Sequence, residues 1–120
     1  MKILVVDDSK AMRMIVIRTL KQTALGTFQT LEANNGAEAL AVIAEHKPDL
    51  VLSDWNMPEM KGIDLLKSLR SSGNTTTFGF ITSESSAEVR KEAEDAGASF
   101  LVTKPFTPNS FEAAISPVLA

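Results

Sequence analysis

Five short strand-like runs, spaced along the whole chain, constrain the fold of this sequence more than any other feature. They cover residues 3–6, 28–33, 50–52, 77–81 and 100–102. The first and third runs are wholly apolar and rich in branched side chains, which is typical of strands buried on both faces of a parallel sheet. Residues 28–33 alternate imperfectly between apolar and polar and predict an outer strand.

A helical pattern follows each of these runs. Apolar residues recur at spacings of three and four over about 9–23, after Gly36, over 62–69, over 83–96 and after Thr107. Pro117 should kink or end the last helix nearby. The expected buried stripes are Met12, Ile15, Val16 and Leu20 in the first helix, and Ala37, Leu40, Ala41 and Ala44 in the second. The expected caps are Asp8 or Ser9, an asparagine of the pair at 34–35, and Thr107 at helix starts, with Gly97 at a helix end.

Strands that alternate with helices predict an α/β fold with a parallel sheet, covered by helices on both faces through right-handed crossovers. The pattern contains five β-α units and predicts a five-stranded, doubly wound sheet. A chain of 120 residues has the usual size of one domain. We therefore expect a single domain over residues 1–120.

Composition excludes several classes of protein. Apolar residues make up 44% of the chain and charged residues 22%, as in globular proteins. No apolar run approaches a membrane span, and Asp7 and Asp8 interrupt the first run too early for a signal peptide, so we expect a cytoplasmic protein without membrane contact. The chain has no cysteine and a single histidine, His46, which excludes thiolate and multi-histidine metal sites. A net charge of −3 without a basic run disfavours direct nucleic-acid binding.

The predicted strands end in residues with compatible chemistry. Asp7 and Asp8 follow the first strand, Asp54 the third, Thr82 the fourth and Lys104 the fifth. Sites in parallel sheets lie at the carboxyl ends of the strands, so these side chains should meet. Three converging carboxylates would repel one another unless their pKa values rise or a cation neutralises them. Oxygen ligands suit Mg²⁺.

Each of these residues also has an ordinary structural explanation. Adjacent aspartates are common helix caps, Thr82 is a frequent strand residue, and Lys104 alone would be a surface lysine. Taken together they are more informative. An aspartate flanked by a cation, an ammonium group and a hydroxyl is equipped to act as a nucleophile in phosphoryl transfer.

Four stretches of the chain together resemble the response regulator receiver domain family, and in particular its stand-alone, CheY-like chemotaxis type. They are residues 4–9, 53–58, 81–84 and 97–106. The resemblance extends over essentially the whole chain. It implies a flavodoxin-like receiver fold of the (βα)5 type.

The resemblance also implies roles for individual residues. Asp54 would accept a phosphoryl group from a phosphohistidine on a sensor histidine kinase. Asp8, Asp54 and the backbone carbonyl of Asn56 would bind Mg²⁺ directly, and Asp7 would act mainly through a metal-bound water. Thr82 would bind a phosphoryl oxygen and move inward on activation.

For the remaining positions, the resemblance implies that Lys104 pairs with the phosphoryl group, or with Asp54 before phosphorylation. The Lys104–Pro105 bond would be cis. Asn56 and Glu84 occupy the positions that tune autodephosphorylation, and both match the chemotaxis type, which indicates a short-lived phosphoryl group. Leu101 occupies the switch position.

Three positions depart from the chemotaxis type. Leu101 stands where that type has tyrosine, and therefore lacks a hydroxyl that could report movement of Thr82. Phe100 stands where glycine is common, and Lys61 replaces the usual aspartate before Gly62. The last helix also carries few charges, so a strongly basic output face is not evident.

The expected function is that of a phosphorelay regulator in chemotaxis or motility. Phosphorylation would switch the face formed by 83–96, 100–102 and 107–119 to control a downstream effector protein, without turnover of a separate substrate. A Mg²⁺-dependent phosphatase with an aspartate nucleophile is the alternative, although its group places the second aspartate two residues after the first. A receiver domain cut from a longer regulator also remains open, whereas a nucleotide carrier would need a glycine-rich loop that the sequence lacks.

Overall fold

The computed structural model describes residues 1–84 and 86–119, and within them it contains one parallel sheet. The strand order is β2-β1-β3-β4-β5. This order reverses direction between β1 and β3, which is the topological switch of a doubly wound sheet. The strands are β1 (Lys2–Val6), β2 (Gln29–Ala33), β3 (Leu50–Asp54), β4 (Thr77–Thr82) and β5 (Phe100–Thr103).

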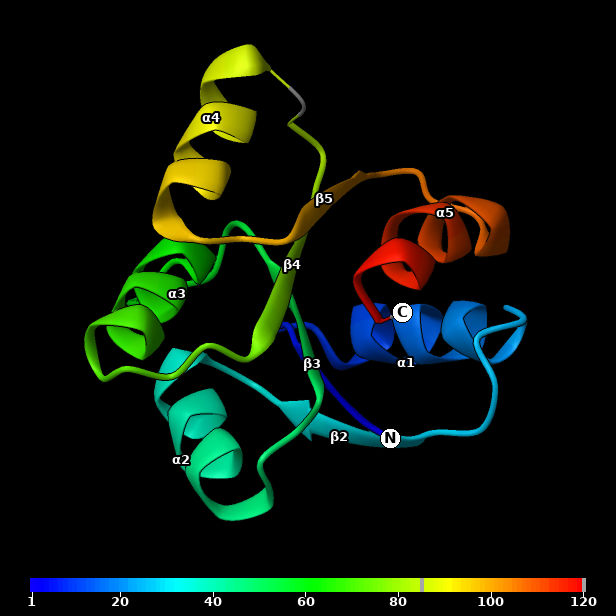
Figure 1. Ribbon diagram of the computed structural model, residues 1–120, viewed down its shortest axis with the longest axis horizontal. Helices are drawn as coiled ribbons and strands as arrows, with labels where there is room; N and C mark the ends of the chain where they lie inside the picture. The colour runs from blue at the N-terminus through cyan, green and yellow to red at the C-terminus, as the bar shows by residue number, and fades with distance from the viewer. Residues whose placement is uncertain (85, 120) are drawn as a thin grey trace.

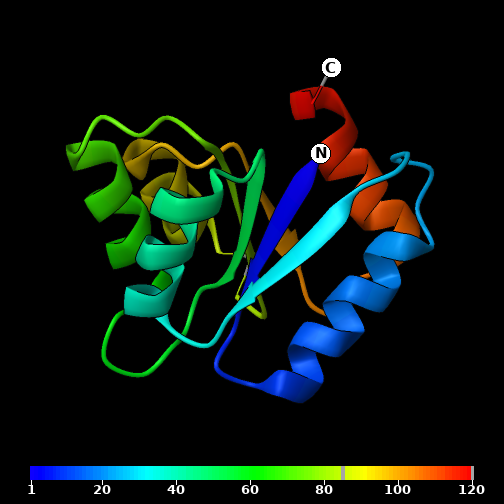
Figure 2. The ribbon, with the colours of Figure 1, turned by 90° about the horizontal axis from the view of Figure 1, so that it is seen from below.

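Helices cover both faces of the sheet. In Figures 1 and 2, α1 and α5 lie on one side of the strands, and α2, α3 and α4 lie on the other. The predicted α/β architecture is therefore confirmed. No described helix is long and apolar enough to cross a membrane. The helices are α1 (Lys10–Lys21), α2 (Gly36–His46), α3 (Gly62–Ser71), α4 (Ala87–Ala96) and α5 (Pro108–Leu119).

The central strands owe their continuous apolar sequence to burial on both faces. In β1, Ile3 and Val5 pack into the core beneath α1 and α5, whereas Leu4 and Val6 pack into the core beneath α2 and α3. Successive strand residues point to opposite faces, so each face needs its own apolar side chain. The edge strand β2 has a mixed burial pattern, as its mixed sequence predicts.

Most predicted helix caps are confirmed. The Ser9 hydroxyl accepts a hydrogen bond from the backbone N–H of Met12, and the Asn35 side chain accepts one from Glu38. Thr107 and Ser110 cap each other reciprocally at the start of α5. Gly97 ends α4 with a φ of 101°, a conformation that glycine adopts without steric cost.

The fourth helix begins later than predicted. The sequence pattern indicated a start at Ser83, but α4 begins at Ala87, and Ser86 caps it by accepting a hydrogen bond from Val89. The side chain of Thr82 instead binds the backbone N–H of Glu84, which holds the chain in a turn before the helix. Ser85, also inside the predicted helix, lies outside the described residues.

The predicted buried stripes are wrong in two helices. In α2 the buried residues are Gly36, Ala39 and Ile43, whereas Ala37, Ala41 and Ala44 are exposed. Alanine is small enough for either face, so the bulky Ile43 determines which face is buried. In α1, Ile15 is 47% exposed, and the helix spans a shorter range than 9–23. The last helix continues for two residues beyond Pro117.

Candidate metal centre at the carboxyl edge of the sheet

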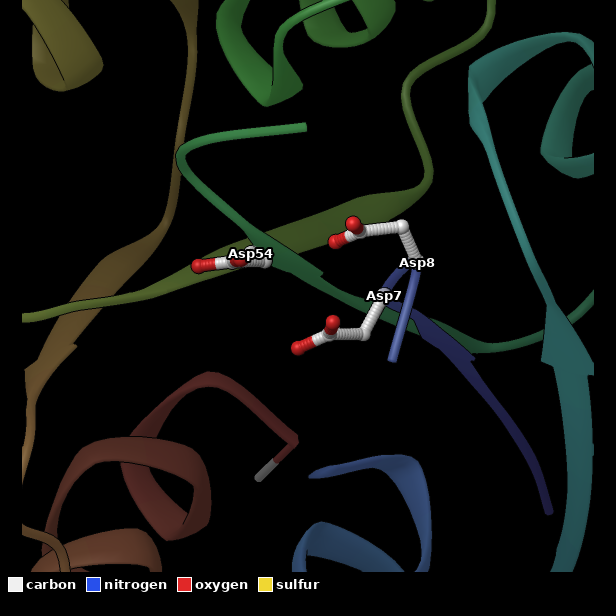
Figure 3. Close-up of side chains that lie close together, drawn as sticks. All are labelled: Asp7, Asp8 and Asp54. Carbon is white, nitrogen blue, oxygen red and sulfur yellow. The ribbon is translucent and has the colours of Figure 1, made fainter. Parts of the chain in front are cut away.

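Three carboxylates meet at the edge where β1 and β3 end. Asp54 is the last residue of β3, and Asp7 and Asp8 directly follow β1, which pairs with β3 up to Val6 and Ser53. One carboxylate oxygen of each aspartate lies within 4.8 Å of the others. Figure 3 shows the three side chains grouped beside the ends of the two strands. The sequence-based prediction that these residues converge is confirmed.

Asp7 is the most buried member of this group. Its exposed fraction is 5%, its backbone N–H donates to the Ala33 carbonyl, and its Oδ1 accepts a 2.9 Å hydrogen bond from Ser9. Burial raises the pKa of the Asp7 carboxyl above its ordinary value, and the nearby Asp54 adds to this effect, while the Ser9 hydrogen bond opposes it. Removing a charged group from water disfavours its ionised form. A cation would therefore stabilise the ionised group.

Lys104 faces the carboxylates from the end of β5. Its Nζ lies 3.3 Å from Oδ1 of Asp54, and both side chains are largely buried. The pairing of Lys104 with Asp54 and the cis Lys104–Pro105 bond agree with the sequence-based predictions. The backbone N–H of Lys104 donates to the Thr82 carbonyl, which holds the end of β5 against the end of β4.

Thr82 ends β4 and is 1% exposed. Its hydroxyl oxygen accepts a 3.0 Å hydrogen bond from the backbone N–H of Glu84, and the Glu84 side chain is exposed. Thr82 therefore lies at the same edge of the sheet as Asp54. Leu101 lies farther along the sheet on β5, half-buried beside α4, in the wall of a cavity of about 420 Å³ that Arg90, Ala93 and Glu94 also line.

The loop after Asp54 is anchored by backbone contacts. The Trp55 N–H donates to the Ile81 carbonyl, and the Gly62 N–H donates to the Trp55 carbonyl. A Cβ at Gly62 would collide with the Asp54 carbonyl oxygen, so only glycine lets α3 begin this close to β3. Asn56 is exposed on this loop.

Arg13, which the sequence analysis did not single out, lies directly behind the acidic group. Its guanidinium donates hydrogen bonds to the Asp7 carbonyl, to Glu32 and to Asn34. A signal was present in the sequence, because Arg13 lies three residues before the buried Val16 on the same helical face. A charged residue that extends a buried stripe needs polar partners, and these three acceptors supply them.

Comparisons with known proteins agree with this geometry. A family model described as the response regulator receiver domain matches residues 3–116. The chain is 43% identical to chemotaxis protein CheY-3 of Vibrio cholerae, over 89% of this chain and 82% of that protein. It is 39% identical to chemotaxis protein CheY1 of Helicobacter pylori, over 99% and 97% of the two chains. The crystal structure of Vibrio cholerae CheY4 superposes with a TM-score of 0.86 at 33% identity, covering 98% and 97%.

Proposed function

The chain belongs to the response regulator receiver domain family, and on that premise we propose that Asp54 accepts a phosphoryl group from a sensor histidine kinase. One observation carries the assignment to Asp54: its carboxylate belongs to the acidic group and also pairs with Lys104. No other carboxylate of the described residues has both contacts. A nucleophile between cationic groups is suited to an incoming phosphoryl group with negative oxygens.

The donor set of the acidic group fits Mg²⁺. All three side chains offer oxygen, and the oxygens lie close enough to share one ion. We propose that Asp8, Asp54 and the Asn56 carbonyl hold the ion directly and that Asp7 holds it through water. A bound Mg²⁺ would neutralise the carboxylates and draw negative charge away from the phosphoryl oxygens.

The protein side chains then have distinct tasks in the transfer. A carboxylate oxygen of Asp54 forms a bond to phosphorus as the bond from phosphorus to the histidine nitrogen breaks, and the electron pair stays on that nitrogen. Lys104 exchanges its partner from the Asp54 carboxylate to a phosphoryl oxygen, because that oxygen carries the new negative charge. The Thr82 hydroxyl donates to a second phosphoryl oxygen.

The output of this transfer is a change in the face formed by α4, β5 and α5. The Thr82 hydroxyl oxygen accepts a hydrogen bond from the Glu84 N–H in the turn that precedes α4, so inward movement of Thr82 toward a phosphoryl oxygen would carry that turn with it and alter the start of the helix. Leu101 has no hydroxyl, so it would respond to movement of β4 and α4 through its packing contacts. It lies in the wall of the α4–β5 cavity. This face would control a downstream effector protein. The tuning residues Asn56 and Glu84 would keep the phosphoryl group short-lived.

Chemotaxis or motility is the proposed pathway, because relatives similar over almost the whole chain are named chemotaxis proteins. In this proposal the protein is a signalling regulator, and its only phosphoryl substrate is its own Asp54. It needs neither nucleic acid nor a membrane as a direct partner.

Labelling with a small phosphodonor tests the proposal. Incubation with acetyl phosphate and Mg²⁺ should add one phosphoryl group to the wild type, measured as intact mass. Asp54→Asn should abolish the labelling, whereas Asp64→Asn, which changes an exposed carboxylate on α3, should leave it unchanged. Full labelling of the Asp54→Asn variant would overturn the assignment. Many turnovers of a chromogenic phosphate ester would favour the phosphatase alternative instead.

A further inference from the structure

The peptide group between Asp7 and Asp8 has an unusual anchor. Its carbonyl oxygen, that of Asp7, accepts a 2.6 Å hydrogen bond from Nη1 of Arg13. The Asp7 side chain is itself fixed by Ser9, but Asp8 is exposed, and among the residues that the structure describes no hydrogen bond reaches its carboxylate. The direction of the Asp8 side chain therefore depends on the backbone that carries it. Arg13 holds that backbone.

The Arg13 side chain is itself held by two further acceptors. Its Nε donates to Glu32 Oε1 at 2.9 Å, and Nη1 also donates to Asn34 Oδ1 at 2.8 Å. Glu32 belongs to β2, and Asn34 lies in the turn before α2. The Arg13 side chain is only 11% exposed. One guanidinium thus joins the first turn of α1, the end of β1 and the end of β2.

We propose that Arg13 is a positioning residue for the cation site, acting through the Asp7–Asp8 peptide group. This inference rests on the proposed function, since it presumes that the acidic group binds Mg²⁺. Partners that orient metal ligands without touching the metal change metal affinity by about 10–100-fold when they are removed. Asp8 is the ligand whose position should depend most on Arg13, because no hydrogen bond from the described residues holds the Asp8 carboxylate itself.

Geometry, rather than charge, is the basis of this role. A positive charge behind the carboxylates would by itself repel a divalent cation, so loss of charge alone should strengthen binding. Loss of the hydrogen bonds should weaken binding. Lysine keeps the charge but is a single point donor, whereas arginine presents a planar fork that can reach three acceptors. Arg13→Lys and Arg13→Ala therefore separate the two effects.

Mg²⁺ titration of the unphosphorylated protein provides the test. Trp55 is the only tryptophan, is 7% exposed and follows Asp54, so its fluorescence should report binding at this edge; calorimetry provides an independent measurement. We expect Arg13→Lys, which keeps the charge but loses hydrogen bonds, to raise the Kd for Mg²⁺ by about 10-fold or more, and Arg13→Ala, which also loses the charge, to raise it by a smaller factor. Arg18→Ala, an exposed arginine on the same helix, should leave the Kd unchanged.

A metal-free measurement separates positioning from loss of structure. Thermal unfolding in EDTA identifies variants that are folded at the titration temperature, and the amide resonance of Asp8 should shift in the folded Arg13→Lys protein before any Mg²⁺ is added. If the Arg13 variants do not fold, Asn34→Ala combined with Glu32→Gln loosens the same guanidinium from its outer partners and should raise the Kd several-fold. Folded variants with a Kd within two-fold of the wild type would overturn the inference.

The same titration distinguishes the two proposals. A wild type that binds no Mg²⁺ would overturn the proposed function, and the inference with it. A wild type that binds Mg²⁺, loses binding with Asp54→Asn and keeps it with Arg13→Lys would leave the proposed function intact and overturn the role of Arg13 alone.

Discussion

The acidic edge and α4 lie at neighbouring parts of the molecule but are held very differently. At the acidic edge, Asp7 is fixed through its N–H, its carbonyl and its side chain, and Lys104 anchors Asp54. In α4, Ala93 is the only buried residue of the helix. At the end of α4, the Arg70 guanidinium donates hydrogen bonds to the Gly97 and Asn74 carbonyls.

This difference fits the two tasks of the proposed phosphorylation switch. A group that must bind a cation and a phosphoryl group gains from fixed ligands, because no free energy is then spent on ordering them. An element that must change state needs a small energy gap, and such elements usually come from the less stable parts of a fold. Four substitutions can break or sharpen this comparison.

Gly62→Ala should have the largest effect, because it disturbs the fixed edge directly. The new methyl group would meet the Asp54 carbonyl, the Phe80 ring and the Ser53 hydroxyl. Overpacking against a backbone that cannot move should lower the free energy of unfolding by about 3 kcal/mol, measured by urea denaturation. Gly73→Ala is the control: it meets open space, and its φ of 83° should cost only about 1 kcal/mol. Equal losses would show that the edge can yield.

Arg70→Met should loosen α4 without disturbing the edge. It removes two 2.9 Å hydrogen bonds from a guanidinium, and hydrogen bonds to charged groups contribute about 2 kcal/mol. Amide exchange should accelerate in α4, while the Mg²⁺ affinity stays at the wild-type value. Lys67→Met, an exposed position on α3, should change neither quantity. A change in Mg²⁺ affinity with Arg70→Met would mean that the two regions are not independent.

Asp7→Asn should stabilise the metal-free protein at neutral pH. The pKa of Asp7 is raised in the folded state by burial, so between pH 3.8 and that higher pKa the folded state holds a proton that the unfolded state has lost. Stability is therefore lost as the pH rises through this window. Asparagine does not titrate, so the stability of the variant lacks this pH dependence. In urea unfolding with EDTA, the variant should have the higher free energy of unfolding at pH 7 and no advantage below pH 3.8.

Added Mg²⁺ should reverse the order of the two proteins. The wild type gains more from the ion because its ionised Asp7 is part of the binding site, whereas the asparagine variant lacks that charge. A variant that is less stable than the wild type at pH 7 in EDTA would contradict the role of burial in this shift.

The sequence predicted the acidic edge better than it predicted α4, for a physical reason. The carboxyl ends of the strands in a parallel sheet lie at one edge, so the alternation of strands and helices alone placed Asp8 and Asp54 at the same edge. The start of α4 was harder to predict, because both Ser83 and Ser86 could stand at the beginning of the helix. The hydrogen bond from the Glu84 N–H to the Thr82 hydroxyl favours the later start, with Ser86 as the cap. The spacing of apolar residues carries no information about that single side-chain hydrogen bond.

The buried face of a helix rich in small residues was equally hard to predict. A helix rich in alanine has no unique apolar stripe, so the buried face of α2, with Ala39 and Ile43, could not be read from the spacing of the alanines. Arg13 shows the opposite case. Its position on the buried side of α1 was legible from the spacing to Val16. Its acceptors, however, are Asp7 after β1, Glu32 in β2 and Asn34 in the turn after β2, and only the folded chain brings them together.

Glu59→Asn should have the smallest effect and asks whether backbone strain contributes to the acidic edge. Glu59 lies in the loop after Asp54 with a φ of 67°, and Lys47, at the end of α2, has a φ of 48°. Asparagine tolerates this conformation better than either residue, so each substitution should add about 0.5 kcal/mol to the free energy of unfolding. If Gly62 and Arg13 fix the edge, Glu59→Asn should leave the Mg²⁺ affinity as unchanged as Lys47→Asn does. A Kd that changes only with Glu59→Asn would instead make the strained loop part of what holds the ligands in place.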